Sequence, residues 1–253
     1  MHEIIELERA AARHWRGTEE EWLGGWLLRA AEGFTGRANS ALPLADPDMP
    51  LDDAVAAVAD WYRARGLPPM IAVPLPLEGA GAGDKLDTYL SERKWATRSS
   101  PAFVMTADLA SVSPSPELSA GAAFRTDAEP DDEWLRLYHY RGQAQQPPVI
   151  RKLLASAEFQ AFVSIRSGGG AMAVGRLSIA EGWAGITAVE VDPAYRRRGL
   201  GAALTQAICA EAAARGVRRA FLQVETTNTA ARTLYERCGF RYSHRYHYRV
   251  APT

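Results

Sequence analysis

The most regular alternation of apolar and polar positions lies in the second half of the chain. Residues 183–191 place β-branched side chains at a period of two around Glu190, which predicts a strand that Asp192-Pro193 ends. From Leu200 onward apolar residues recur with the spacing of one helix face, and Gly216 suits the position just beyond the helix end. The pattern therefore predicts a strand, a loop and a long helix in succession.

Similar patterns along the rest of the chain predict further helices and strands. Amphipathic spacing predicts helices at residues 4–15, 52–62, 84–93, 132–140, 149–155 and 229–237. Alternating or short apolar runs bounded by glycine or proline predict strands at 22–30, 37–42, 70–75, 102–107, from 124, and at 159–165, 171–179, 218–225 and 241–250. We therefore predict an α/β fold, of the α+β type with a mixed sheet.

Two parts of the sequence resemble each other, which predicts an internal duplication. Residues 64–67, a strand and then 89–95 parallel 214–217, a strand and then 234–240. The alternative is an unrelated α/β domain with a chance similarity.

The duplication predicts a division of the chain. The first domain spans residues 1–110, a Pro/Ser-rich linker spans 111–122, and the second domain spans 123–253. A fragment from Ala120 onward is expected to keep the binding function of the second domain.

The loop before the long helix has the composition of a phosphate-binding site. Arg196-Arg197-Arg198-Gly199-Leu200-Gly201 places glycines where the backbone turns into the helix, which leaves amide groups able to bind an anion. Arginines before a helix N-terminus are electrostatically unfavourable unless an anion binds there. The alternative is a solvated arginine-rich turn. The corresponding helix start in the first half has Asp52-Asp53 and no glycine, so residues 1–110 are not expected to bind phosphate.

Composition and charge narrow the function classes. The chain has 253 residues and a formal net charge of −1, which argues against extensive nucleic-acid binding. Its cysteines, Cys209 and Cys238, provide no disulfide framework, and no spacing of His and Cys suits a metal ion. No apolar run is long enough to cross a membrane and the N-terminus has no signal-peptide pattern. We expect a cytoplasmic protein with no metal, nucleic-acid or membrane partner.

Two motifs, in this order, resemble the general-control-type N-acetyltransferase (GNAT) superfamily. They are Val-x-Val-x-Pro-x-x-Arg-x-x-Gly-x-Gly from Val189 and Asn-x-x-Ala-x-x-Leu-Tyr-Glu-x-x-Gly-Phe from Asn228. The similarity spans roughly residues 124–250. It implies two GNAT-like domains in tandem, the first degenerate, and a mostly antiparallel central sheet whose splayed strand pair binds acetyl-CoA.

The resemblance implies acetyl-CoA as the cosubstrate. Its pyrophosphate would lie on the amides of residues 197–202 and its pantetheine arm along residues 189–191, where the family has a β-bulge. An amide of that strand, from Val191, would polarise the thioester carbonyl. Asn228 matches the family's cofactor-contacting asparagine, although a helix N-cap explains it equally. The implied cofactor contacts are Val189, Val191, Arg196, Arg197, Arg198, Gly199, Leu200, Gly201, Ala202 and Asn228.

The resemblance also implies catalytic residues. Tyr235 matches the family tyrosine that protonates the departing thiolate, and its alternative role is packing in the core. Ribosomal-protein alanine acetyltransferases of the superfamily have a glutamate where this chain has Gln223, which cannot serve as a base. Glu190 is therefore the first candidate for the catalytic base and Glu225 the second, with a water chain as the alternative.

The implied activity is acetyl transfer from acetyl-CoA to a primary amine of an unidentified small molecule, peptide or protein. The alternatives are a non-catalytic acyl-CoA-binding module and a small-molecule enzyme whose tandem layout resembles that of mycothiol synthases. The aromatic face of residues 242–248 predicts either an acceptor pocket or an interface between the domains. We expect a monomer or a homodimer.

Overall fold

The structure, a computed structural model, describes residues 2–79, 81–98, 100–115, 117–138, 147–168 and 170–252. The predicted helix end at residues 139–140 lies outside the described residues.

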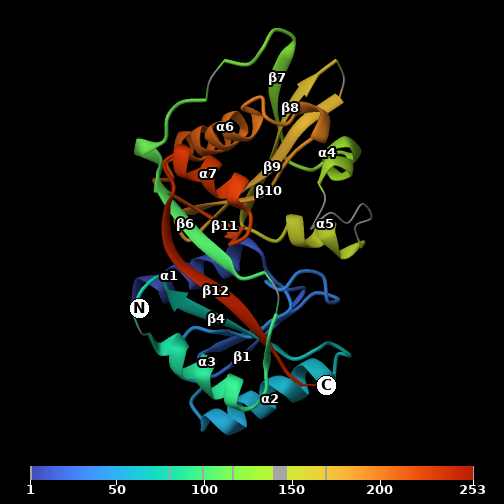
Figure 1. Cartoon of the computed structure of the whole chain (residues 1–253). Coiled ribbons are helices and arrows are strands. Elements are labelled where there is room, and N and C mark those ends of the chain that lie inside the picture. The colour runs from blue at the N-terminus through green and yellow to red at the C-terminus, as the bar shows by residue number, and fades with distance from the viewer. Residues whose placement is uncertain are drawn as a thin grey trace.

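The described chain contains helices and strands in both halves (Figure 1). In the first half the elements are α1 (His2–His14), β1 (Glu19–Leu23), β2 (Trp26–Ala30), β3 (Leu42–Pro43), α2 (Leu51–Arg63), β4 (Met70–Pro76), α3 (Ala82–Glu92), β5 (Ala96–Thr97), β6 (Ala102–Asp108) and the 3₁₀ turn η1 (Leu109–Ser111). In the second half they are β7 (Ala122–Asp127), α4 (Asp132–Leu137), α5 (Val149–Leu154), β8 (Phe159–Ser167), β9 (Gly170–Ala180), β10 (Trp183–Val191), η2 (Pro193–Tyr195), α6 (Leu200–Ala214), β11 (Arg219–Glu225), α7 (Thr229–Arg237) and β12 (Arg241–Val250).

One large sheet runs through both halves of the chain. Among the described residues its strand order is β4-β12-β6-β11-β10-β9-β8-β7, with β5 at the side of β12. In the described part of this sheet β10 and β11 pair in parallel, and the other neighbouring strands are antiparallel. The mixed α/β fold predicted from the sequence is confirmed.

Strand exchange joins the two halves. β6 from the first half lies between β11 and β12 of the second half, and β12 in turn pairs with β4 of the first half (Figure 1). The halves also contribute similar successions, α2-β4-α3-β5-β6 and α6-β11-α7-β12, which differ by the short strand β5. The division at residues 111–122 remains a prediction about the sequence, and the hydrogen-bonded sheet continues across it.

Clusters of buried residues lie on both faces of this sheet. Val163 and Ala173 pack in the core that contains the buried residues of α6, whereas their neighbours Phe162 and Val174 pack with Trp134 of α4. Alternation along a strand places successive side chains on opposite faces. α6 and α7 therefore cover one face, and α1, α4 and α5 cover the other.

The first predicted strands differ from the structure. The strand expected at residues 22–30 is a hairpin, β1 and β2, that turns at Gly24 with φ of +52°. The strand expected at 37–42 is reduced to β3, because the Asn39 side chain holds the preceding loop. Its Oδ1 accepts from the amides of Ala31 and Gly33, and its Nδ2 donates to the Phe34 carbonyl. A side chain that satisfies the local backbone competes with strand pairing.

Candidate active site at the fork between two strands

β10 and β11 separate into a fork near the middle of the sheet. They pair from Trp183 opposite Arg219 to Ile186 opposite Leu222, and both strands continue beyond this point without pairing to each other. On the other side of β10, the register against β9 shifts between Thr187 and Glu190. This shift is the bulge that the family resemblance implied, and it lies at the start of the fork.

Ala188 makes the bulge sharp. Its φ of +56° lies in the left-handed region, which a non-glycine residue adopts at an energetic cost. A strained backbone position directly at the fork is typical of functional sites.

Beyond the bulge, the side chains of β10 alternate between the two faces of the sheet and one amide points toward the fork. Val189 and Val191 pack against the core beside α6, so Glu190 faces the opposite side of the sheet. The Asp192 amide donates to the Met172 carbonyl, so by antiparallel alternation the Val191 amide points away from β9 and toward the fork. The Val191 amide is thus oriented as the predicted contact with the thioester carbonyl requires.

The loop after β10 brings the three arginines to the surface before α6. Asp192 begins the loop, and its Oδ1 accepts from the Ala194 amide at 2.9 Å. Arg196 Nε donates to the Val191 carbonyl at 3.2 Å, and Arg198 Nη2 donates to the Ala194 carbonyl at 3.3 Å. All three arginine side chains are exposed, so their positive charge remains available to an anion.

The start of α6 has no side-chain cap. Its N-cap is Gly199, with φ of +79°, and Arg197 before it also has a positive φ of +63°. The first amides of a helix have no partner within the helix, and those of residues 200–202 lie at the positive end of α6. This is the arrangement that binds phosphate at helix N-termini.

The two glycines of the motif have different roles. Gly199 supplies the left-handed backbone, and a Cβ there would meet nothing within 4 Å. Gly201 permits close packing, because a Cβ there would lie 2.6 Å from Leu234 Cδ1 on α7. Sequence reasoning assigned both glycines to the phosphate loop and missed the helix contact.

Asn228 begins α7 as its N-cap. Its Oδ1 accepts from the Ala231 amide at 3.1 Å, and the residue is exposed. The structure therefore shows the capping role, and the cofactor contact stays a prediction.

Tyr235 projects from α7 into the core beside the fork. The residue is 9% exposed and meets the Phe240 ring edge-on, with ring centroids 6.1 Å apart. Burial raises the pKa of the Tyr235 phenol above its ordinary value, and the charges of Cys238 and Glu190 raise the pKa further. The two predicted catalytic side chains, Tyr235 and Glu190, thus lie within electrostatic range of each other.

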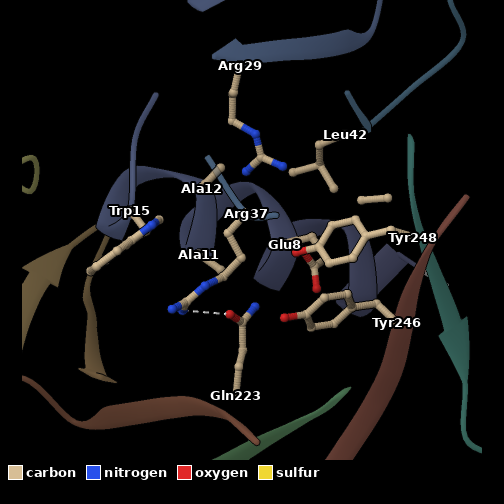
Figure 2. Close-up of a pocket in the computed structure, with 11 residues that line it drawn as sticks. Glu8, Ala11, Ala12, Trp15, Arg29, Arg37, Leu42, Gln223, Tyr246 and Tyr248 are labelled. Atoms are coloured by element: carbon tan, nitrogen blue, oxygen red, sulfur yellow. Dashed lines mark hydrogen bonds between the residues drawn. The ribbon is translucent and has the colours of Figure 1, made fainter. Parts of the chain in front are cut away.

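A cavity of about 140 Å³ lies beside the fork, between the two halves of the chain. It is lined by Gly36, Arg37, Ser100, Ala102, Gln223, Glu225, Tyr246 and Tyr248. A second, smaller cavity adjoins it and shares Arg37, Gln223 and both tyrosines (Figure 2). The aromatic face of β12 is therefore both a wall of a pocket and part of the interface between the halves.

Gln223 is held by a residue that sequence reasoning missed. Arg37 Nη1 donates to Gln223 Oε1 at 2.8 Å, and Figure 2 shows this bond in the centre of the cavity, between Trp15 and the two tyrosines. Gln223 directly follows Leu222, the last residue of β11 that pairs with β10. Only its departure from the family's glutamate could have drawn attention to this position.

Buried polar pairs close the far side of the smaller cavity. Glu8 Oε1 and His244 Nε2 are 2.7 Å apart, and both side chains are buried. Arg29 Nε donates to the Ser40 carbonyl at 3.2 Å. The first pair joins α1 to β12 across the two halves, and the second joins β2 to the loop before β3 within the first half.

In the described residues, no helix has the length and apolar character needed to span a bilayer. No group of three or more His, Cys, Asp or Glu side chains in this part of the chain could hold a metal ion.

Comparison with known proteins finds similarity over the whole chain. Residues 1–249 match the family described as Probable histone acetyltransferase Rv0428c C-terminal. The chain is 32% identical over 263 residues to Probable histone acetyltransferase Rv0428c of Mycobacterium tuberculosis, which covers 98% of this chain and 74% of that protein. It is 27% identical to the uncharacterized N-acetyltransferase YobR of Bacillus subtilis, with 99% of each chain covered. Among solved structures, a GCN5-related N-acetyltransferase from Kribbella flavida has a TM-score of 0.70 and 20% identity, and 99% of this chain and 96% of that chain are covered.

Proposed function

The chain belongs to the Rv0428c C-terminal family within the GNAT superfamily and is an acetyltransferase, and we propose that it transfers an acetyl group from acetyl-CoA to a primary amine. The observation that carries this proposal is the fork of β10 and β11, which opens next to the uncapped start of α6. The relatives are named acetyltransferases, which favours an enzyme over a non-catalytic acyl-CoA-binding module.

Acetyl-CoA would bind along the opened edge of β10. Its pyrophosphate takes the amides of residues 197–202, and the side chains of Arg196, Arg197 and Arg198 supply charge-assisted bonds to phosphate oxygens. Its pantetheine arm runs beside residues 189–191 as an added strand. The Val191 amide, which points toward the fork, donates to the thioester carbonyl and stabilises the oxyanion that forms there.

The chemical step is direct attack of the amine on the thioester. The amine nitrogen forms a bond to the carbonyl carbon, the carbon–sulfur bond breaks, and the coenzyme A thiolate takes a proton from the Tyr235 hydroxyl. The Tyr235 phenol is protonated at neutral pH, as a proton donor requires, because its pKa is not below the ordinary value for tyrosine. Glu190 on β10, or Glu225 on β11, takes the proton that the amine gives up.

Calorimetry and an assay of coenzyme A release test this proposal. Acetyl-CoA is expected to bind with measurable heat, and release is expected to rise with a panel of primary amines and peptides. A folded protein that takes up no acetyl-CoA refutes the proposed function.

The Tyr235→Phe variant tests the proton donor. It is expected to lower turnover by about 100-fold or more, the scale of general acid catalysis, while acetyl-CoA affinity stays nearly unchanged. Tyr89→Phe is the matched control, because Tyr89 lies on α3 of the first half and bonds Asp52 there. Equal turnover in both variants removes Tyr235 from the mechanism.

A further inference from the structure

The first half of the chain contributes a cation to the mouth of the fork. Arg37 reaches across the interface to Gln223, the first residue of β11 beyond its pairing with β10. Its guanidinium carbon lies 4.9 Å from the centre of the Trp15 ring. The fork is where an acceptor amine must approach the thioester, so Arg37 stands beside the acceptor.

The charge of Arg37 has no anionic partner in the part of the chain that the structure describes. Among the described residues no carboxylate lies within ion-pair distance of it, and its hydrogen-bond partner Gln223 is a neutral amide. A glutamate at position 223 would pair with Arg37 and cancel its charge. The glutamine instead orients the guanidinium and leaves most of its donors for another group.

A second guanidinium strengthens the positive potential. Arg176 on β9 is fully buried, and its guanidinium carbon lies 5.7 Å from the centre of the same Trp15 ring. Its bonds go to neutral oxygens, including the carbonyls of Leu154 and His14, and its Nη2 has no partner in the described structure. Burial and the nearby charge of Arg37 lower the pKa of Arg176 to about 9. Among the described residues neither guanidinium has a carboxylate partner, and Arg37, the one of the two that lines the cavity, favours an anion there.

A negatively charged side chain, Glu225, lines the same cavity as Arg37. Glu225, two residues further along β11, lines the 140 Å³ space together with Arg37 and the hydroxyl-bearing residues of β12. The cavity is smaller than the sites of drug-sized ligands, which begin at about 300 Å³. A space of this size, with a guanidinium and a carboxylate on its walls, fits a small group that carries an ammonium and an anion a few bonds apart.

We propose that the acceptor is a small amine that bears a carboxylate, such as a free amino acid, and that Arg37 binds this carboxylate while the amine faces the fork. Arginine suits this role because its planar fork binds a carboxylate through two parallel hydrogen bonds. The inference rests on the proposed acetyl transfer and names its substrate class. It makes Arg37 a specificity-determining residue supplied by the half of the chain that lacks the phosphate loop.

Matched pairs of acceptors test this inference. Coenzyme A release is measured with glycine against glycinamide, and with alanine, serine and glutamate against their α-carboxamides. The wild-type protein is expected to prefer the carboxylate form about 10- to 100-fold in kcat/KM, the range of a charge-assisted hydrogen bond. Equal use of both forms overturns the inference and leaves the proposed function intact.

Two variants locate the preference at Arg37. Arg37→Gln removes the cation, and Gln223→Glu keeps the arginine but neutralises it with a nearly isosteric partner. Both are expected to bring the preference to within a few-fold of unity while acetyl-CoA affinity, measured by calorimetry, is kept. Arg65→Gln is the control, because Arg65 stacks on Trp61 outside the cavity. A preference that survives in both folded variants overturns the assignment to Arg37.

Product binding completes the test where turnover is slow. The coenzyme A complex is titrated with N-acetylglycine and with N-acetylglycinamide. Tighter binding of the carboxylate form, lost in Arg37→Gln, supports the inference, and equal binding or none overturns it. Absence of acetyl-CoA binding, in contrast, refutes the proposed function itself.

Discussion

His14 makes the stability of the protein depend on pH in a predictable window. It is the last residue of α1, it is 1% exposed, and its ring bonds the second half of the chain at two places. Its Nδ1 lies 2.9 Å from Ser178 Oγ and its Nε2 lies 3.2 Å from the Ala180 carbonyl. Burial and the charge of Arg176 lower the pKa of His14 from 6.5 to about 4.

The sign of the effect follows from which state binds the proton more tightly. Between pH 6.5 and 4 the unfolded chain takes up a proton at His14 that the folded protein excludes. The contribution of neutral His14 to the free energy of unfolding is therefore complete above about pH 6.5 and is lost as the pH falls toward 4. With these two pKa values, the free energy of unfolding falls by about 2 kcal/mol between pH 7.5 and pH 5.

Urea unfolding of the full chain, followed by tryptophan fluorescence at pH 7.5 and pH 5, measures this loss. His14→Gln keeps a polar side chain and removes the titration, so its loss between the two pH values is expected to be smaller than that of the wild type by about 2 kcal/mol. His2→Gln is the control, because the His2 side chain is 87% exposed and pairs with Glu6 on the same helix. An equal loss in wild type and His14→Gln refutes the reasoning.

Two further predictions concern the sheet and the loop. A fragment of residues 120–253 lacks β4, β5 and β6, which leaves β12 without these three partners and β11 paired with β10 alone. We therefore expect neither cooperative unfolding by circular dichroism nor acetyl-CoA binding, contrary to the expectation from sequence. A folded fragment that binds acetyl-CoA would contradict this. Gly199→Ala puts a side chain at φ of +79° and is expected to cost about 1–2 kcal/mol in urea unfolding and to weaken acetyl-CoA binding in calorimetry. Gly216→Ala, with φ of +78° at the other end of α6, is expected to cost similar stability without changing acetyl-CoA binding. If both variants bind acetyl-CoA equally well, Gly199 is not part of the binding site.

The parts of the site that are contiguous in sequence were predictable. β10, the loop with Arg196 and Gly199, and the start of α6 follow one another within some twenty residues. Alternation, a proline stop and glycines at a helix start are local signals, because each depends on backbone preferences of neighbouring residues. The same signals failed at residues 22–30, where Gly24 and Gly25 turn the chain back on itself inside a run of strand-forming residues.

The parts that join distant residues were decided by the tertiary structure. Arg37 and Gln223 are 186 positions apart, and their contact exists because β6 enters the sheet beside β11 and brings the first half against the fork. Periodicity indicates which face of a strand is buried but not which strand lies beside it. The sequence by itself determined the strand, the phosphate loop and the helix, since these are set by local conformation. Only the tertiary structure decided that the Arg37 charge lies beside the fork, since this depends on the pairing of strands far apart in the sequence.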